Sequence, residues 1–162
     1  MAKNKEEKTN VMRVLEQKKI AYTPHSYPHE EGVAVDGVTV AKSMGFDPAI
    51  VFKTLVARGA SKQYYVFDVP VAENLDLKKA AKAVGEKSIE MIHQKELLPL
   101  TGYVHGGCSP VGMKKLFPTV FHSSAENLAA MIVSAGKIGY QVELAPHDLA
   151  ALVRAKFADI IA

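Results

Sequence analysis

The sequence predicts an α+β fold in which a mixed, curled, barrel-like β-sheet is surrounded by helices. Segments with helical periodicity interleave irregularly with short segments rich in β-branched and aromatic residues, and the strict βαβ alternation of a parallel sheet is missing. Two strand-like segments, Phe52–Ala57 and Gln63–Val69, flank a Gly59-Ala60-Ser61-Lys62 turn, which is typical of a β-hairpin.

Length and composition fit one domain over residues 1–162. Apolar residues make up 48% of the chain and charged residues 23%, as in an ordinary soluble protein. The polar start lacks the apolar core of a secretory signal, and we expect residues 1–8 to be flexible. No apolar run reaches the roughly 18 residues of a membrane span. With a single cysteine, Cys108, these features favour a cytoplasmic protein.

The N-terminal third predicts helices joined by an extended segment. Val11, Val14 and Leu15 share one face at helical spacing, and Thr9 or Asn10 can cap that helix. In chain order the signals are a helix over Thr9–Ile20, an extended segment over Ile20–Tyr27, a helix over Asp36–Met44 that ends at Gly45, and a helix start at Asp47-Pro48.

Beyond the hairpin, the clearest helix spans Asn74–Val84. Its apolar positions fall on one face, and Gly85 follows as a terminator; these positions are Leu77, Ala80, Ala81 and Val84. The remaining expected elements are helices over His93–Leu98 and Pro146–Lys156 and strands near Tyr103-Val104, Thr119–His122, Met131–Ser134 and Gln141–Leu144.

Lys53 is the first candidate for a functional residue. It interrupts the apolar segment Ile50–Val56, where side chains alternate between the two faces of a strand. A lysine in that setting is either an edge residue that reaches water or the cation of a binding pocket. The strand pattern leaves both readings open.

Two glycine-rich segments, Gly106–Gly112 and Ser134–Gly139, form a second candidate. Glycines allow backbone N–H groups to approach a ligand closely, and consecutive N–H groups can bind an anion or a developing oxyanion. The alternative is a pair of tight turns between strands. Neither segment matches a nucleotide-binding GxGxxG or GxxxxGK[ST] motif, so a nucleotide fold is not indicated.

Other reactive side chains give weaker signals. Cys108 lies three residues after His105 and invites a nucleophile hypothesis, although a small buried cysteine in a turn is the commoner arrangement. The six histidines show no HExxH or zinc-finger spacing, so neither a metal nor a cofactor is expected. The net charge of +3 neither marks nor opposes a nucleic-acid binder.

An ordered set of motifs resembles the YbaK/EbsC family, specifically its Cys-tRNA(Pro) deacylase branch. The match runs from about Val11 to Ala158. Its members are Phe52-Lys53-Thr54-Leu55, Val69-Pro70-Val71-Ala72, Leu75–Ala83, Thr101-Gly102-Tyr103-Val104, Gly106-Gly107-Cys108-Ser109-Pro110 and Val133–Gly139. The resemblance implies a fold related to the editing domain of bacterial prolyl-tRNA synthetases and hydrolysis of mischarged aminoacyl-tRNA in trans.

The resemblance also implies site residues. Lys53 matches the essential lysine of the family, and Gly107 lies in the loop whose N–H groups would bind the oxyanion. The expected substrate-binding residues are Tyr27, Thr54, Gly106, Cys108, Ser109, Pro110, Ser134 and Gly136. Three lysines, Lys78, Lys79 and Lys82, are candidates for contact with the tRNA backbone; the alternative is a solvated helix face.

Three positions depart from the family pattern. Cys108 replaces an expected aliphatic residue, which argues against a required cysteine nucleophile. Gln141 replaces an aspartate, and Asp68 replaces a threonine. The implied mechanism needs no protein nucleophile, because the thiol of the substrate cysteine attacks its own ester and the pocket orients that thiol.

The expected partners are aminoacyl-tRNA, namely tRNA(Pro), and prolyl-tRNA synthetase, without a membrane or a metal. Two alternatives stay open: deacylation of another mischarged tRNA such as Ala-tRNA(Pro), and a non-catalytic module that binds tRNA or a synthetase.

Overall fold

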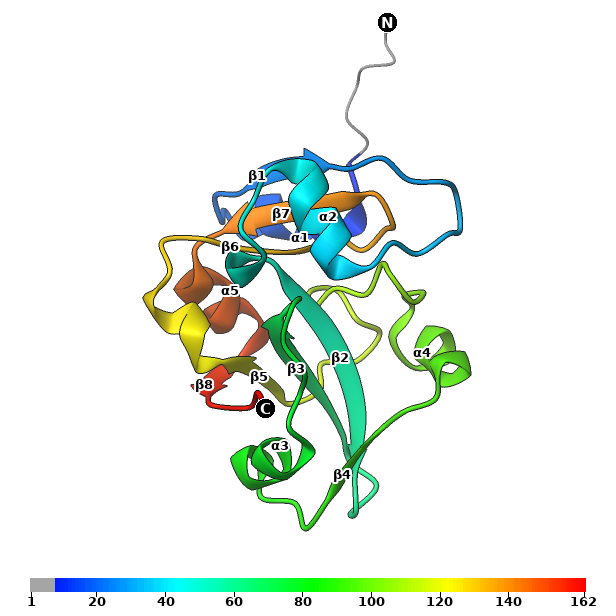
Figure 1. Cartoon of the computed structure of the whole chain (residues 1–162), viewed down its shortest axis with the longest axis vertical. Coiled ribbons are helices and arrows are strands. Elements are labelled where there is room, and N and C mark those ends of the chain that lie inside the picture. Colours follow the sequence, from blue (N-terminus) through cyan, green and yellow to red (C-terminus); the bar gives the residue numbers. More distant parts are fainter. Residues whose placement is uncertain (1–7) are drawn as a thin grey trace, which may run out of the picture.

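The structure is a computed structural model that describes residues 8–162. Two β-sheets and five α-helices build this part of the chain (Figure 1). The helices are α1 (Asn10–Gln17), α2 (Gly37–Met44), α3 (Leu77–Val84), α4 (Gln94–Thr101) and α5 (Pro146–Val153), with short 3₁₀ turns η2 (Pro48–Ile50) and η3 (Ser123–Asn127). The strands are β1 (Thr23–Ser26), β2 (Phe52–Gly59), β3 (Tyr64–Pro70), β4 (Ile89–Met91), β5 (Thr119–His122), β6 (Met131–Ser134), β7 (Tyr140–Leu144) and β8 (Lys156–Ala158).

The larger sheet has five strands in the order β4-β2-β3-β5-β8, and the smaller sheet has three in the order β1-β7-β6. β3–β5 and β5–β8 are parallel pairs, whereas β2–β3 and β2–β4 are antiparallel, so the larger sheet is mixed. A parallel bridge between Val51 and Ile132 connects the two sheets. The mixed α+β class is confirmed; within residues 8–162 the two sheets remain distinct rather than closing into one barrel.

The five-stranded sheet is buried on both faces. On one face Val66 and Phe121 pack with α1, α5 and the smaller sheet. On the other face Phe67 and Val120 pack with Ala80 and Ala81 of α3. This alternation along β3 and β5 places successive side chains on opposite faces of the sheet, as strand geometry requires.

The predicted caps Thr9 and Asp36 act as expected, whereas α1 ends at Gln17 instead of Ile20, α3 begins at Leu77 instead of Asn74, and α4 ends at Thr101 instead of Leu98. The side chains of Thr9, Asp36 and Asp76 accept hydrogen bonds from the first-turn backbone of α1, α2 and α3. Gly45 and Gly85 adopt left-handed conformations with φ of 81° and 75° and end α2 and α3.

Some predictions are wrong. Tyr103-Val104 is a loop instead of a strand, because the Tyr103 amide donates to the Thr101 hydroxyl and the Tyr103 hydroxyl donates to the Val111 carbonyl. The helix expected from Asn74 begins only at Leu77, because Asp76 caps it, and Leu77 is 42% exposed although the other apolar positions of its face are more buried. The expected helix to Lys156 ends at Val153, where left-handed Arg154 leads into β8.

The predicted flexible lead-in at 1–8 lies, except for Lys8, outside the described residues. Within the described part of the chain, no helix has the length and apolar composition needed to cross a membrane.

Asp68 is the one carboxylate within the buried stretch of β3. It is fully buried between Phe67 and Val69, and its Oδ1 accepts a 2.5 Å hydrogen bond from the Thr54 hydroxyl on β2. Its Oδ2 has no hydrogen-bond partner among residues 8–162. Burial raises the pKa of Asp68 to about 7, because a charge is poorly solvated in this core.

The raised pKa predicts that Asp68 makes stability depend on pH. The folded state binds this proton more tightly than the unfolded state, so the stabilisation is lost as pH rises through about 7. Between pH 5 and 8, the free energy of unfolding of the wild type should fall by about 2–3 kcal/mol more than that of Asp68→Asn, measured by denaturant titration. Parallel pH profiles for the two proteins would contradict this assignment.

Candidate functional site

A cavity of about 300 Å³ lies where the two sheets meet α2. The N-terminal part of β2 forms one wall, α2 and the loop before it form another, and the glycine-rich loop 105–108 and the smaller sheet close the rest. The lining residues are Tyr27, Val35, Asp36, Gly37, Val40, Val51, Phe52, Lys53, Thr54, Leu55, Val71, Leu97, His105, Gly106, Cys108, Ser134 and Gln141. We call it the Lys53 cavity.

Lys53 is half-buried in this cavity. Its ammonium has no hydrogen-bond or ion-pair partner among residues 8–162, and the charge of Glu73 acts on it without forming an ion pair. Burial lowers the pKa of Lys53, and Glu73 opposes this effect in part. An unpaired, partly desolvated cation in an apolar cavity is suited to bind an anion or a developing negative charge.

Thr54 and Cys108 connect the Lys53 cavity to the buried carboxyl group of Asp68. Thr54 lies opposite Asp68 in the β2–β3 ladder and donates its hydroxyl hydrogen to Oδ1. Cys108 is 8% exposed; burial first, and the charge of Asp68 second, raise the pKa of its thiol to about 12. At neutral pH this thiol is protonated and therefore a poor nucleophile.

Ser134 and Gln141 bring the smaller sheet into the same cavity, since they are register partners in the β6–β7 ladder. The Ser134 hydroxyl accepts the Gly136 N–H at 3.0 Å. Gln141 is 6% exposed, and its Oε1 has no hydrogen-bond partner within the described chain. Because an unpaired buried acceptor costs free energy, the Gln141 carbonyl is an available acceptor for a ligand.

Only some residues of the glycine loop line the cavity, and the others are buried beside it. Gly106 and Cys108 line the cavity, whereas Gly107, Ser109 and Pro110 are buried and are not among its lining residues. The Gly107 N–H, expected to bind an oxyanion, donates to the Val104 carbonyl at 2.9 Å. The N–H groups of Gly106 and Cys108 have no acceptor among residues 8–162.

Position 107 favours glycine because the backbone of the loop containing Lys137 and Ile138 packs directly on it. A Cβ at position 107 would lie 3.1 Å from the Ile138 nitrogen and 3.3 Å from Lys137 backbone atoms. Gly136 was expected to bind substrate together with Lys53. It lines a second cavity instead, together with Tyr103, Ile138 and Tyr140. The two glycine-rich loops are thus in contact, but only parts of each face the Lys53 cavity.

The three lysines predicted to contact tRNA are not among the lining residues of the Lys53 cavity. They belong to α3, which contacts β4 and packs through Ala80 and Ala81 on the face of the larger sheet that carries Phe67 and Val69. Lys79 donates to Asp159 at 3.0 Å and to the Ile161 carbonyl at 2.9 Å, which attaches the C-terminal segment to α3. Lys78 and Lys82 are exposed.

Sequence reasoning missed several lining residues. Asp36 was expected only as a helix cap, and it also lies at the cavity rim; His105 was considered only as a partner of Cys108. No hydrogen bond joins His105 to Cys108 in the described structure, so the pair is not a catalytic dyad here. Among residues 8–162, no cluster of three or more His, Cys, Asp or Glu could hold a metal ion.

Comparisons with known proteins agree with the fold and the motifs. Residues 32–152 match the aminoacyl-tRNA editing domain. EbsC of Enterococcus faecalis, whose name describes a Cys-tRNA(Pro)/Cys-tRNA(Cys) deacylase, is 46% identical over 161 residues, 99% of this chain and 98% of its own.

Two solved structures share the fold. A hypothetical protein, APE2540, superposes with a TM-score of 0.82 at 18% identity, covering 94% of this chain and 99% of the other. A structure described as a trans-editing enzyme for prolyl-tRNA synthetase gives a TM-score of 0.79 at 24% identity, covering 94% of each chain. The chain belongs to the aminoacyl-tRNA editing domain family, which confirms the YbaK/EbsC resemblance of its motifs.

Proposed function

We propose that this protein removes cysteine from Cys-tRNA(Pro) in trans and that the cysteinyl ester binds in the Lys53 cavity. The enzyme class, an aminoacyl-tRNA deacylase, follows from the family. The observation that carries the finer proposal is a small cavity that offers a free cation and an unpaired acceptor but no activated nucleophile. Cysteine suits such a site because it brings its own nucleophile.

The side chains around the cavity argue against a protein nucleophile. The Cys108 thiol is protonated at neutral pH. The Thr54 hydroxyl donates to a carboxylate behind the cavity wall, and the Ser134 hydroxyl bonds to the Gly136 amide. Activation of a nucleophile requires a base that is hydrogen-bonded to it. In the described structure no histidine or lysine is hydrogen-bonded to any of these three groups.

In the proposed reaction, the sulfur of the substrate cysteine attacks the carbonyl carbon of its own ester. A C–S bond forms, the C–O bond to the ribose breaks, and the thiol proton is transferred to the departing ribose oxygen. The products are free tRNA and a cyclic thioester of cysteine, which water then opens to cysteine. Because both reacting groups belong to one substrate residue, the protein contributes mainly orientation and charge stabilisation.

The polar groups of the cavity suggest how the cysteinyl group is oriented. Lys53 repels the α-ammonium of the substrate and attracts the negative charge that develops on the carbonyl oxygen. The unpaired Oε1 of Gln141 can accept a hydrogen bond from the α-ammonium. The N–H groups of Gly106 and Cys108 replace that of Gly107 as proposed oxyanion donors, since the latter is already bonded to Val104.

Prolyl-tRNA synthetase is the proposed partner, because it is the enzyme that charges tRNA(Pro). Lys78 and Lys82 remain candidates for contact with the tRNA backbone near the acceptor stem, whereas Lys79 is engaged by Asp159. Contacts of this kind would make activity fall steeply with salt.

Replacement of Lys53 tests the site. Lys53→Ala should lower kcat/KM for Cys-tRNA(Pro) about 10²–10³-fold, as expected for loss of one group that stabilises the transition state. Lys42→Ala, which changes an exposed lysine of α2 outside the cavity lining, is the matched control and should deacylate like wild type. Wild-type activity in Lys53→Ala would refute the site.

Replacement of Cys108 tests whether the attacking thiol belongs to the substrate or to the protein. Cys108→Ala should keep deacylation within about fivefold of wild type, because only packing is lost. Single-turnover deacylation should be measured beside thermal unfolding. Loss of more than about 100-fold in a folded variant would instead identify Cys108 as the nucleophile.

The substrate series tests thiol assistance directly. Cys-tRNA(Pro) should react far faster than Ser-tRNA(Pro) or Ala-tRNA(Pro), because neither competitor carries a thiol. Similar rates for all three would show attack by water. Binding without turnover of any charged tRNA would show a non-catalytic module.

A further inference from the structure

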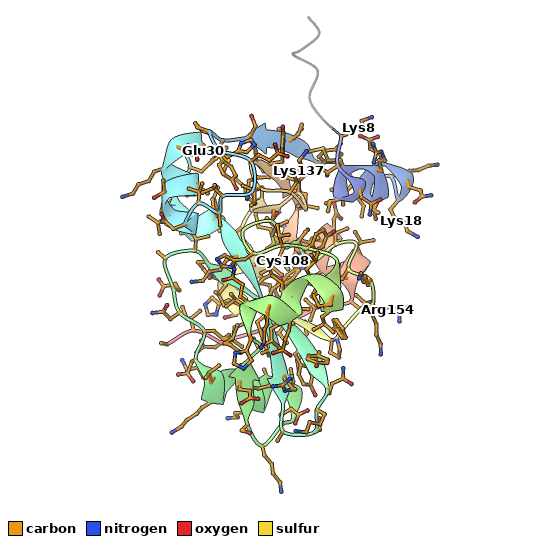
Figure 2. The ribbon with its side chains drawn as sticks, turned by 90° about the vertical axis from the view of Figure 1, so that its right-hand side faces the viewer. Lys8, Lys18, Glu30, Cys108, Lys137 and Arg154 are labelled. Atoms are coloured by element: carbon orange, nitrogen blue, oxygen red, sulfur yellow. The ribbon has the colours of Figure 1, made fainter. Side chains whose placement is uncertain are left out.

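The second cavity, of about 500 Å³, lies next to the Lys53 cavity. Its lining is formed by His29, Glu31, Gly32, Gly102, Tyr103, Val104, Gly136, Lys137, Ile138 and Tyr140. We call it the Tyr140 cavity. Figure 2 shows Lys137 in the upper part of the molecule and Cys108 below it, nearer the centre. The volume falls within the range of about 300–1,000 Å³ that is usual for small-molecule sites.

The same three chain segments line both cavities. The segment after β1 contributes Tyr27 to the Lys53 cavity and His29 to the Tyr140 cavity. The glycine loop contributes Gly106 to the first and Val104 to the second. The loop between β6 and β7 contributes in the same way, with Ser134 facing the first and Gly136 the second. The cavities are therefore adjacent.

The Tyr140 cavity carries side chains that suit a nucleobase. The rings of His29 and Tyr140 lie edge to face, with centroids 5.6 Å apart, and the Lys137 ammonium is 5.6 Å from the Tyr140 centroid. Val104, an apolar side chain, is 46% exposed here. Aromatic rings beside lysine are the usual means of binding unpaired bases, which stack on the rings while the cation meets phosphate.

Two polar groups of this cavity favour a base over a phosphate. The Nδ1 of His29 lies 2.9 Å from the Tyr27 carbonyl, so Nδ1 carries the hydrogen and Nε2 of the neutral ring is an acceptor. Glu31 adds a carboxylate, which repels phosphate and accepts from an exocyclic amine. Adenine offers such an amine together with a face for stacking.

We propose that the Tyr140 cavity binds the terminal adenine of the aminoacylated tRNA while the Lys53 cavity holds the amino acid. This inference rests on the proposed function, because the adenine and the ester share one ribose. An ester bound in the Lys53 cavity leaves the adenine in an adjacent space, and the Tyr140 cavity is an adjacent space with aromatic walls.

The test uses an uncharged acceptor-stem RNA of tRNA(Pro) in which 2-aminopurine replaces the terminal adenine. Its fluorescence should be quenched on binding, because the base stacks on a ring, and the absence of tryptophan from this protein keeps the background low. Tyr140→Leu, which removes the ring and keeps apolar bulk, should abolish the quench and weaken binding about 5- to 150-fold, the range expected for one stacking contact.

Two further variants serve as controls for the fluorescence measurement. Tyr22→Leu changes a tyrosine outside both cavities and should behave like wild type. Lys53→Ala should keep the quench while losing deacylation, which separates base binding from chemistry. Circular dichroism must show that each variant is folded.

The outcomes distinguish this inference from the proposed function. No quench with wild type, or an unchanged quench in folded Tyr140→Leu, overturns the adenine site even if Cys-tRNA(Pro) is deacylated. A quench that depends on Tyr140, in a protein that deacylates no charged tRNA, supports the adenine site and refutes the proposed function.

Discussion

The parallel bridge between Val51 and Ile132 is the contact on which the candidate site depends. It joins the start of β2 to β6, and both residues are almost completely buried. Lys53 follows Val51 by two positions, and Ser134 follows Ile132 by two. Since side chains two residues apart on a strand point to the same side, one bridge sets the relation between the cation of one sheet and the polar groups of the other.

Close backbone packing gives the site its second constraint. Gly107 lies against Lys137 and Ile138 so tightly that a Cβ would contact their backbone at 3.1–3.3 Å. The same packing commits the Gly107 N–H to the Val104 carbonyl and leaves its neighbours on either side facing the Lys53 cavity. Gly107 is therefore structural, whereas Gly106 borders the cavity. The sequence alone cannot distinguish the roles of two consecutive glycines.

Sequence patterns predicted features that depend on local interactions. The caps at Thr9 and Asp36 and the β2–β3 hairpin follow from signals within a few residues. The three-residue strands β4 and β8 exist only because a longer neighbouring strand is present, so periodicity could not reveal them. Lys53 was identifiable as a charge within an apolar strand, whereas His105 enters the cavity through tertiary packing alone.

Asp68 and Gln141 show how polarity is distributed around the substrate. The acid lies behind the cavity wall, bonded to Thr54, and the neutral amide borders the cavity. A carboxylate at position 141 would offer Lys53 a competing anion within the same cavity, whereas an amide leaves the lysine charge unpaired. Both residues keep one unpaired oxygen, so the fold alone does not satisfy their hydrogen bonds. For Gln141 the missing donor can be the substrate α-ammonium, which would make substrate binding complete a hydrogen bond that folding leaves open.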